Sequence, residues 1–301
     1  MRLIKSGKVK DVYEVSDREL EFVFSDRVSV FDKIIPSSIP HKGETLARTS
    51  AYWFEVAERL GIPTHFIGLK SPNRMRVKRV EVVSDYRLLN PQSKCYLIPL
   101  ECVSRHFVYG SLWDRVKEKV VLPLHLGFPA NHDIKLGEPL PEPFFEVTTK
   151  LEKYDRPLTT EEALRISGMT PQEFEQMKEL ALQIDEEIGS RVRQRGLIHV
   201  DGKKEFAFDE ERVLMVVDTM GTADEDRFWD AEEFGRGRFI ERSKEFVRQY
   251  YRRVGYYNEL TVARKEGRIE PPIPPLPEYM VEQTSKIYVR LFEDITGQPF
   301  R

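Results

Sequence analysis

The segment from residue 170 to residue 217 constrains the fold of this chain more than any other. Its first residues have the types and spacing of a helix start: Thr170 as a side-chain cap, Pro171 at the first helical position and Glu173 to complete a capping box. The residues that follow place one apolar stripe on this helix, made of Phe174, Met177, Ala181, Ile184, Ile188 and Val192. The pattern predicts a helix that packs one face against the core and ends near Gly196.

An antiparallel β-hairpin is predicted directly after this helix. Two apolar runs, 197–208 and 213–217, flank the polar loop 209–212. Other strand-type runs are predicted at 3–4, 9–15, 20–24, 76–84, 95–99 and 102–108. Further helices are predicted at 46–60, 239–253 and 278–295, with extended connections at 122–143 and 271–277. We therefore expect an α+β fold with a β-rich first lobe, 1–110, and an α+β second lobe, 111–301.

The overall composition excludes several functional classes. The 301 residues include 47 Lys+Arg and 50 Asp+Glu, so a formal charge of -3 gives no steering field toward nucleic acid or an anionic membrane. Cys95 and Cys102 are too few for a disulfide framework, which fits a reducing compartment. The longest aliphatic run, Val213 to Val217, is far shorter than the roughly 20 residues of a membrane helix. We expect a cytoplasmic protein that binds small molecules, with neither nucleic acid nor a membrane as partner.

The predicted hairpin carries the most informative charges. Alternate residues of its first strand share one face: Asp201, Lys203 and Glu205. If Phe208 pairs with Val213, Lys203 lies opposite Asp218 and Glu205 is a diagonal neighbour of Asp218, roughly 7–8 Å away at Cα. A cation can bridge two such carboxylates, and Mg²⁺ held by one or two carboxylates is typical of sites that move phosphoryl groups. The alternative is a solvated strand face in which Lys203 pairs with the acids.

Two other stretches are candidates for anion binding. In residues 6–10, a glycine and two lysines at a strand turn can cradle a polyphosphate, or form an ordinary exposed turn. Arg105 and Ser111 offer a guanidinium and a hydroxyl of the kind that clamp a phosphate monoester. Arg227 is a second clamp or the salt-bridge partner of the acidic run 224–226.

Other chemistries find little support in the sequence. The six histidines lack the close spacing of zinc ligands, and no cysteine pair accompanies them. The G-x-S-x-G elbow of serine hydrolases, the P-loop and the dinucleotide fingerprint are also missing from the sequence.

The order of these stretches resembles the SAICAR synthetase family, whose members are phosphoribosylaminoimidazole-succinocarboxamide synthases. The likeness extends over nearly the whole chain. It is carried by GKVKDVY (7–13), SDRVSVFD (25–32), IPHKGETL (39–46), ECVSRHFVYGS (101–111), HVDGKKEFAF (199–208), PPLPEYMVEQTSKIY (274–288) and DITGQPF (294–300). The resemblance implies a two-lobed fold in which a small antiparallel lobe, similar to the small lobe of protein kinases, borders an ATP cleft.

The resemblance also implies a reaction and roles for individual residues. ATP would phosphorylate the carboxylate of the imidazole ribonucleotide CAIR, and the amine of L-aspartate would displace the phosphate. The implied ATP-binding residues are Gly7, Lys8, Lys10 and Glu101, and the implied Mg²⁺ ligands are Glu205 and Asp218. The implied catalytic residues are Lys203, Lys150 and Asp155. The implied substrate contacts are Asp32, Lys42, Arg105, Ser111 and Arg227. Family members are commonly dimers, so a homodimer is compatible with the resemblance.

The sequence departs from the family pattern near Arg227. Where the family has TPDSSRFW, this chain has TADEDRFW, so Glu225 and Asp226 replace two hydroxyl residues. These acids should weaken anion binding unless they point away from Arg227 or bind a metal. Further departures are Tyr154, Gly202, Lys204 and Thr219. Three alternatives therefore stay open: a paralogue that joins another acid and amine, a nucleotide-binding protein without turnover, and a small-molecule kinase.

Overall fold

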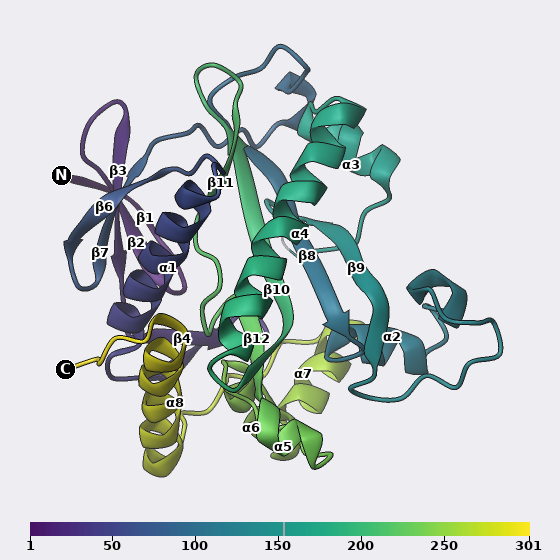
Figure 1. Cartoon of the computed structure of the whole chain (residues 1–301). Coiled ribbons are helices and arrows are strands. Elements are labelled where there is room, and N and C mark those ends of the chain that lie inside the picture. Colours follow the sequence, from purple (N-terminus) through teal and green to yellow (C-terminus); the bar gives the residue numbers. More distant parts are fainter. Residues whose placement is uncertain (153) are drawn as a thin grey trace.

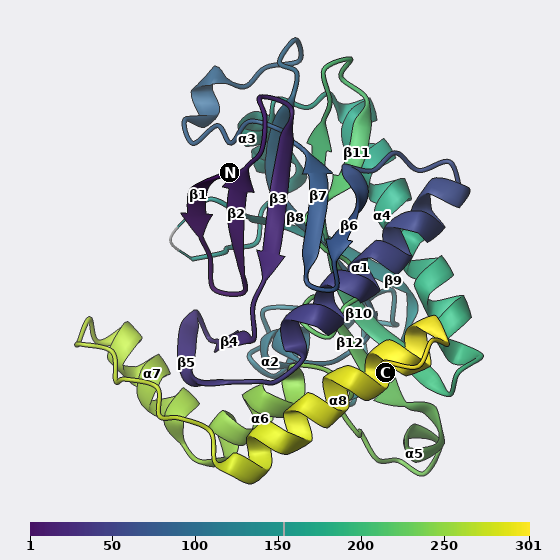
Figure 2. The same cartoon turned by 90° about the vertical axis from the view of Figure 1, so that its left-hand side faces the viewer.

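The computed structural model describes residues 1–152 and 154–301 (Figure 1). The first sheet is antiparallel, with the strand order β1-β2-β3-β7-β6. Its strands are β1 (Arg2–Ser6), β2 (Lys10–Glu14), β3 (Glu19–Phe24), β6 (Phe66–Ser71) and β7 (Arg74–Lys78). Helix α1 (Lys42–Arg59) packs against β3, β6 and β7, as Figure 2 shows, because its apolar side, including Leu46 and Phe54, is buried there.

The second sheet is built around β10. Its order is β11-β10-β8-β9, and β12 also pairs with β10. The strands are β8 (Tyr96–Phe107), β9 (Pro139–Thr149), β10 (Leu197–Phe208), β11 (Leu214–Val217) and β12 (Asp226–Asp230). Strand β11 pairs with the end of β10 and β12 with its beginning, whereas β8 runs along the other edge. The connection between β11 and β12 therefore passes the middle of β10.

Helix α4 (Pro171–Arg193) lies along this sheet. Its predicted start is confirmed, since Thr170 Oγ1 accepts a hydrogen bond from the Glu173 N–H at 3.2 Å. All six residues of the predicted stripe are buried. They join a continuous apolar core that extends through α1 to the first sheet.

The C-terminal helices pack against a small third sheet. That sheet pairs β4 (Arg27–Val30) with β5 (Lys33–Ser38). The helices are α6 (Glu245–Arg253), α7 (Tyr256–Lys265) and α8 (Glu278–Thr296), and they share an apolar core with β4 and β5. The remaining elements are α2 (Ser111–Lys117), α3 (Thr160–Ser167), α5 (Ala231–Gly235) and two 3₁₀ turns, η1 (Tyr86–Leu88) and η2 (Pro123–Leu126). Among the described residues, no helix is both long and apolar enough to cross a membrane.

Two predictions about the strands are wrong. The runs at 95–99 and 102–108 were expected to complete the sheet of the first lobe, but together they form the single strand β8, which pairs with β9 and β10 in the second sheet. The register of the hairpin is shifted by one residue, because Phe208 pairs with Leu214 instead of Val213. The turn closes on Asp209 and Val213: the Asp209 N–H donates to the Val213 carbonyl at 3.0 Å, and Asp209 Oδ1 accepts from the Val213 N–H at 2.8 Å. The division into residues 1–110 and 111–301 stays a prediction.

Candidate active site

The middle of β10 carries a cluster of alternating charges. The Lys203 ammonium lies 2.5 Å from Glu205 Oε1 and 3.0 Å from Glu101 Oε1, which β8 contributes. Lys150, just after β9, forms ion pairs with Glu205 and, at 3.7 Å, with Glu101. Four residues that were predicted separately therefore meet across three neighbouring strands. We call Glu101, Lys150, Lys203 and Glu205 the cleft cluster.

Asp218 joins the cleft cluster through a bend and not through strand pairing. In the observed register Glu205 pairs with Val217, so a continued strand would place Asp218 opposite Lys204. Asp218 instead has a φ of 66°, in the left-handed region, and it ends the strand. Its carboxylate forms an ion pair with Lys10 of β2 at 2.5 Å. The predicted pairing of Lys203 with Asp218 is wrong, but Asp218 and Lys10 meet as a carboxylate and an ammonium from the two sheets.

The charges in this cluster shift one another's pKa values. Burial opposes ionisation of Asp218, but Lys10, Lys150 and Lys203 outweigh it and lower the pKa of that carboxyl. Burial raises the pKa of Glu101 to about 7, with Glu205 adding to the effect and Lys203 opposing it. Although burial disfavours its charge, the surrounding carboxylates raise the pKa of Lys203 well above its ordinary value. The cluster thus combines ionised carboxylates and ammonium groups at one place.

The donor set fits a hard divalent cation. Glu205 and Asp218 offer carboxylate oxygens, the ligand type that Mg²⁺ prefers, and the Asp218 carboxyl is held ionised. Each carboxylate also contacts a lysine, Lys150 for Glu205 and Lys10 for Asp218, so a phosphate that approaches would meet both kinds of charge. Glu205 and Asp218 are therefore chemically suited to hold Mg²⁺ together with a polyphosphate.

Arg105, Ser111 and Arg227 come together around Asp201, as a second cluster. Asp201 Oδ2 accepts hydrogen bonds from Arg105 Nη1 at 3.1 Å and from Arg227 Nη1 at 2.5 Å. Arg105 Nη2 also donates to Ser111 Oγ at 3.2 Å. Gly110 makes the approach possible, because a Cβ there would lie 2.7 Å from the Arg227 guanidinium. We call Arg105, Ser111 and Arg227 the guanidinium clamp.

Two further predicted site residues lie at a cavity of about 690 Å³. Asp32 and Asp155 line it, together with Arg264 and Arg268. Lys8 forms an ion pair with Asp32 at 2.8 Å, where both side chains are about half exposed. Burial and the charge of Asp32 raise the pKa of Asp155. Two predicted site residues, Asp32 and Asp155, therefore face the same cavity.

The turn before β2 depends on Gly7. Its N–H donates to the Lys10 carbonyl at 2.9 Å, and a Cβ at this position would lie only 2.8 Å from that same oxygen. Glycine therefore allows the tight turn from which Lys8 reaches Asp32 and Lys10 reaches Asp218.

Comparisons with known proteins agree with this geometry. A family model described as SAICAR synthetase matches residues 3–263. The phosphoribosylaminoimidazole-succinocarboxamide synthases of Thermoplasma acidophilum and Thermoplasma volcanium are 51% and 50% identical to this chain over 298 residues, which cover 99% of both chains in each comparison. The chain belongs to the SAICAR synthetase family.

Solved structures support the same fold. The SAICAR synthase from Saccharomyces cerevisiae complexed with SAICAR superposes with a TM-score of 0.75 at 24% identity, covering 99% of this chain and 95% of that one. A SAICAR synthetase in complex with ADP superposes with a TM-score of 0.69 at 25% identity and covers 99% of both chains. The predicted α+β, two-lobed class of the SAICAR synthetase family is confirmed.

The structure does not bring Lys42 into either cluster. Its side chain is fully buried, and its ammonium forms an ion pair with Asp224 at 2.9 Å. Tyr288 of α8 donates to the other oxygen of this carboxylate at 2.5 Å. Lys42 therefore ties the start of α1 to the segment before β12, and its role as a substrate contact stays a prediction.

The acids that depart from the family motif point away from Arg227. Glu225 forms an ion pair with Lys203 at 3.2 Å, and Asp226 forms one with Lys204 at 3.0 Å. Sequence reasoning missed Asp201, the residue that holds the two arginines together. The signal that could have identified Asp201 is its position on the same strand face as Lys203.

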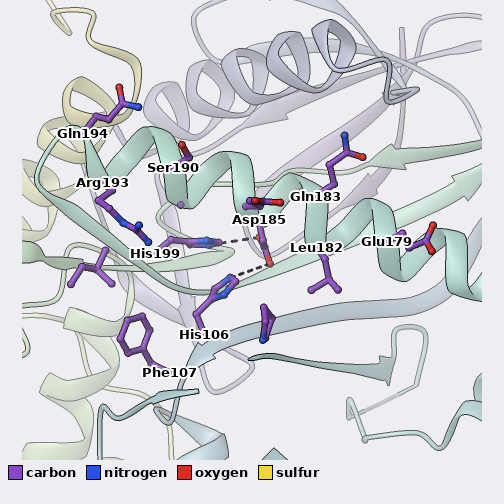
Figure 3. Close-up of a pocket in the computed structure, with 14 residues that line it drawn as sticks. His106, Phe107, Glu179, Leu182, Gln183, Asp185, Ser190, Arg193, Gln194 and His199 are labelled. Atoms are coloured by element: carbon purple, nitrogen blue, oxygen red, sulfur yellow. Dashed lines mark ion pairs between the residues drawn. The ribbon is translucent and has the colours of Figure 1, made fainter. Parts of the chain in front are cut away.

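Another cavity lies beside α4 and is lined by residues of that helix together with His106 and His199 (Figure 3). Its volume is about 1000 Å³. His106 and His199 point toward Asp185 of α4, with ring nitrogens 3.9 Å and 3.8 Å from its carboxylate oxygens. The predicted residues of β10, Lys203 and Glu205, lie on the other face of that strand, by strand alternation from Lys204.

Proposed function

We propose that this chain is an ATP-dependent ligase that joins the amine of L-aspartate to the carboxylate of CAIR, a step of de novo purine biosynthesis. The products are SAICAR, ADP and phosphate. The observation that carries the proposal is the meeting of the cleft cluster with Lys10 and Asp218 from the neighbouring sheet. The names of the relatives and the SAICAR and ADP bound to two structural neighbours support it.

The nucleotide would lie between the two sheets. Lys8 and Lys10, placed by the Gly7 turn, would bind its phosphates, and the backbone near Glu101 would contact the base. Glu205 and Asp218 would hold Mg²⁺, which supplies positive charge that stabilises the phosphate oxygens when it is bound. Phosphoryl transfer through a loose transition state mainly requires aligned reactants and positive charge near the phosphate oxygens. The lysines of the cleft cluster would provide both.

The first chemical step forms an acyl phosphate. A carboxylate oxygen of CAIR attacks the γ-phosphorus of ATP, and the bond from that phosphorus to the bridging oxygen breaks as ADP leaves. Lys203 and Lys150 would face the oxygens whose charge changes in this step. Their ammonium groups already contact carboxylates, so an incoming phosphate replaces one anionic partner with another.

The second step forms the amide. The amine of aspartate attacks the acyl carbon and inorganic phosphate leaves with the electrons of the carbon–oxygen bond. The attacking nitrogen must lose a proton, and Asp155 is the acceptor that we assign. Burial and Asp32 raise the pKa of Asp155, which makes its carboxylate a better base.

The guanidinium clamp would bind the phosphate of the ribonucleotide. Two guanidinium groups and a hydroxyl match the charge and the hydrogen-bond acceptors of a phosphate monoester. Asp201 keeps Arg105 and Arg227 in place when no phosphate is bound. The homodimer and the cytoplasmic location stay predictions.

A reconstituted reaction tests this function. Purified protein is mixed with ATP, Mg²⁺, CAIR and aspartate, and SAICAR is measured by mass spectrometry. We expect SAICAR and ADP in equal amounts, with neither formed when aspartate and CAIR are both omitted. A stable phosphorylated CAIR that accumulates with ADP over many turnovers without aspartate would instead indicate a kinase, and a mixture without either SAICAR or ADP would refute the proposal.

A further inference from the structure

A buried charge cluster lies behind the active-site face of β10. Its members are Asp185 of α4, Lys204 of β10 and Asp226 of β12, whose side chains are all 0% exposed. The Lys204 ammonium contacts both carboxylates, and His199 Nε2 lies 2.7 Å from Asp226 Oδ2. We call Asp185, His199, Lys204 and Asp226 the rear cluster.

Lys204 is the counter-ion of the rear cluster. Atoms of Asp185, His199 and Asp226 lie within 4.8 Å of one another, a spacing that a metal ion can use. The Lys204 ammonium, however, already lies between the two carboxylates and is fully buried itself. The Lys204 ammonium therefore already neutralises the charge that a metal ion would compensate on these carboxylates. The rear cluster is therefore an internal salt-bridge network.

Asp226 connects the rear cluster to the substrate side. Its Oδ2 faces Lys204, and its Oδ1 accepts a hydrogen bond from the Gly221 N–H at 2.9 Å. The same carboxylate thus fixes both ends of the turn from 221 to 226. Arg227 follows Asp226 directly and, by strand alternation, points to the opposite face, where it contacts Asp201 at 2.5 Å. Asp226 therefore fixes the backbone of β12 next to Arg227, whose guanidinium is held on the other face by Asp201 and, at 3.2 Å, by Glu245.

Gly202 makes this arrangement possible. It pairs with Asp226 across the sheet, and a Cβ built on it would overlap with both Asp226 Oδ2 and Lys204 Nζ. Three of the departures from the family pattern, Gly202, Lys204 and Asp226, are therefore parts of one physical arrangement. The lysine neutralises the added carboxylate, and the glycine leaves room for the pair.

We propose that Asp226, held by Lys204 in the space that Gly202 leaves, is a positioning residue that aligns Arg227 with the ribonucleotide phosphate. The proposal rests on the assignment of Arg227 to the proposed CAIR site. The carboxylate does not touch the substrate, so its effect on binding passes through Arg227. Removal of the Asp226 carboxylate leaves the charge of the guanidinium clamp unchanged, but the Arg227 guanidinium is held less rigidly.

Calorimetric titration of the protein with CAIR alone tests this role, since binding is read without turnover. We expect Asp226→Ala to raise the Kd for CAIR about tenfold, as for one misaligned charge-assisted contact. Gly202→Ala should act in the same direction, because its Cβ displaces the same pair without removing a charge. Val216→Ala is the matched control: it removes apolar volume from the adjoining strand, where Val216 is fully buried, and should lower the Tm but leave the Kd within twofold.

Two results would overturn the role of Asp226. One is an unchanged Kd in folded Asp226→Ala and Gly202→Ala proteins, and if the first does not fold, the second decides alone. The other is an equal rise of the Kd in all three variants, which would mark a general loss of stability. A wild-type protein that binds CAIR but makes no SAICAR would count against the proposed function only, and a wild-type protein that binds no CAIR would refute both.

Discussion

The two faces of β10 carry charges of both signs but differ in access to solvent. On the cleft face the side chains of Glu101, Lys150 and Lys203 are 16–22% exposed and that of Glu205 is 2% exposed, whereas those of the rear cluster are at most 1% exposed. Charges near solvent can exchange one partner for another at little cost, but fully buried charges cannot, because each would lose its only compensation. From this difference we infer that the cleft face binds ligands and that the rear face positions residues within the structure.

The strongest test of this comparison removes one carboxylate from the cleft face. Glu205→Gln or Asp218→Asn should lower the rate of SAICAR formation by about 10³-fold, since the proposed cation loses a ligand and the transferred phosphate loses its alignment. The Tm should change by only a few degrees, because the ammonium groups that lose a partner, those of Lys10, Lys150 and Lys203, are 17–22% exposed. Turnover near that of the wild type in either variant would remove that residue from the proposed metal site.

The opposite test removes the counter-ion on the rear face. Lys204→Met leaves Asp185 and Asp226 buried without a cation and should lower the free energy of unfolding by about 3 kcal/mol, measured by urea titration. The control is Lys117→Met, whose ammonium is about half exposed beside Asp114 and should contribute less than about 0.5 kcal/mol. If Lys204→Met and Lys117→Met lowered the free energy of unfolding by similar amounts, the rear cluster would contribute little to stability.

A smaller effect is expected at the guanidinium clamp. Arg105→Ala should raise the KM for CAIR about 30-fold and leave the KM for ATP within twofold, because only the ribonucleotide phosphate meets this side chain. Arg115→Ala is the matched control, since Arg115 shares the partner Glu146 with Arg105 but belongs to α2. Steady-state kinetics with each substrate varied in turn measures both constants. An unchanged KM for CAIR would exclude Arg105 from the clamp.

The smallest expected effect is a pH dependence of stability. Burial raises the pKa of Glu101 to about 7, so between about pH 4.5 and pH 7 the folded protein holds a proton that the unfolded chain has released. Stability from this group therefore falls as the pH rises through that window, by on the order of 1 kcal/mol. Glu101→Gln should flatten the profile of Tm against pH. A profile as steep as that of the wild type would show that other groups cause it.

Features fixed by local chemistry were predictable from the sequence. The capping residues and apolar stripe of α4 agree with the structure, because both depend on residues only three or four positions apart. The hairpin was predicted for the same reason, but its register was not. The turn closes through two hydrogen bonds between Asp209 and Val213, and these have no separate signal in the hydrophobic pattern.

Features that depend on distant segments were predicted less well. Strand β8 has the pattern of any buried strand, and only its pairing with β9 and β10 assigns it to the second sheet. The direction of Asp226 was also undetermined, because its partner Lys204 lies 22 positions earlier in the chain. The family motifs supplied the candidate site residues, and the structure brings most of them into two clusters.

Binding of a non-hydrolysable ATP analogue with and without Mg²⁺, measured by calorimetry, tests the assignment of the cleft face most directly. The wild-type protein should bind the analogue more tightly with Mg²⁺, and Glu205→Gln should lose most of that gain while keeping its Mg²⁺-independent affinity. An equal gain from Mg²⁺ in the two proteins would contradict the assignment of nucleotide and cation to this face of β10.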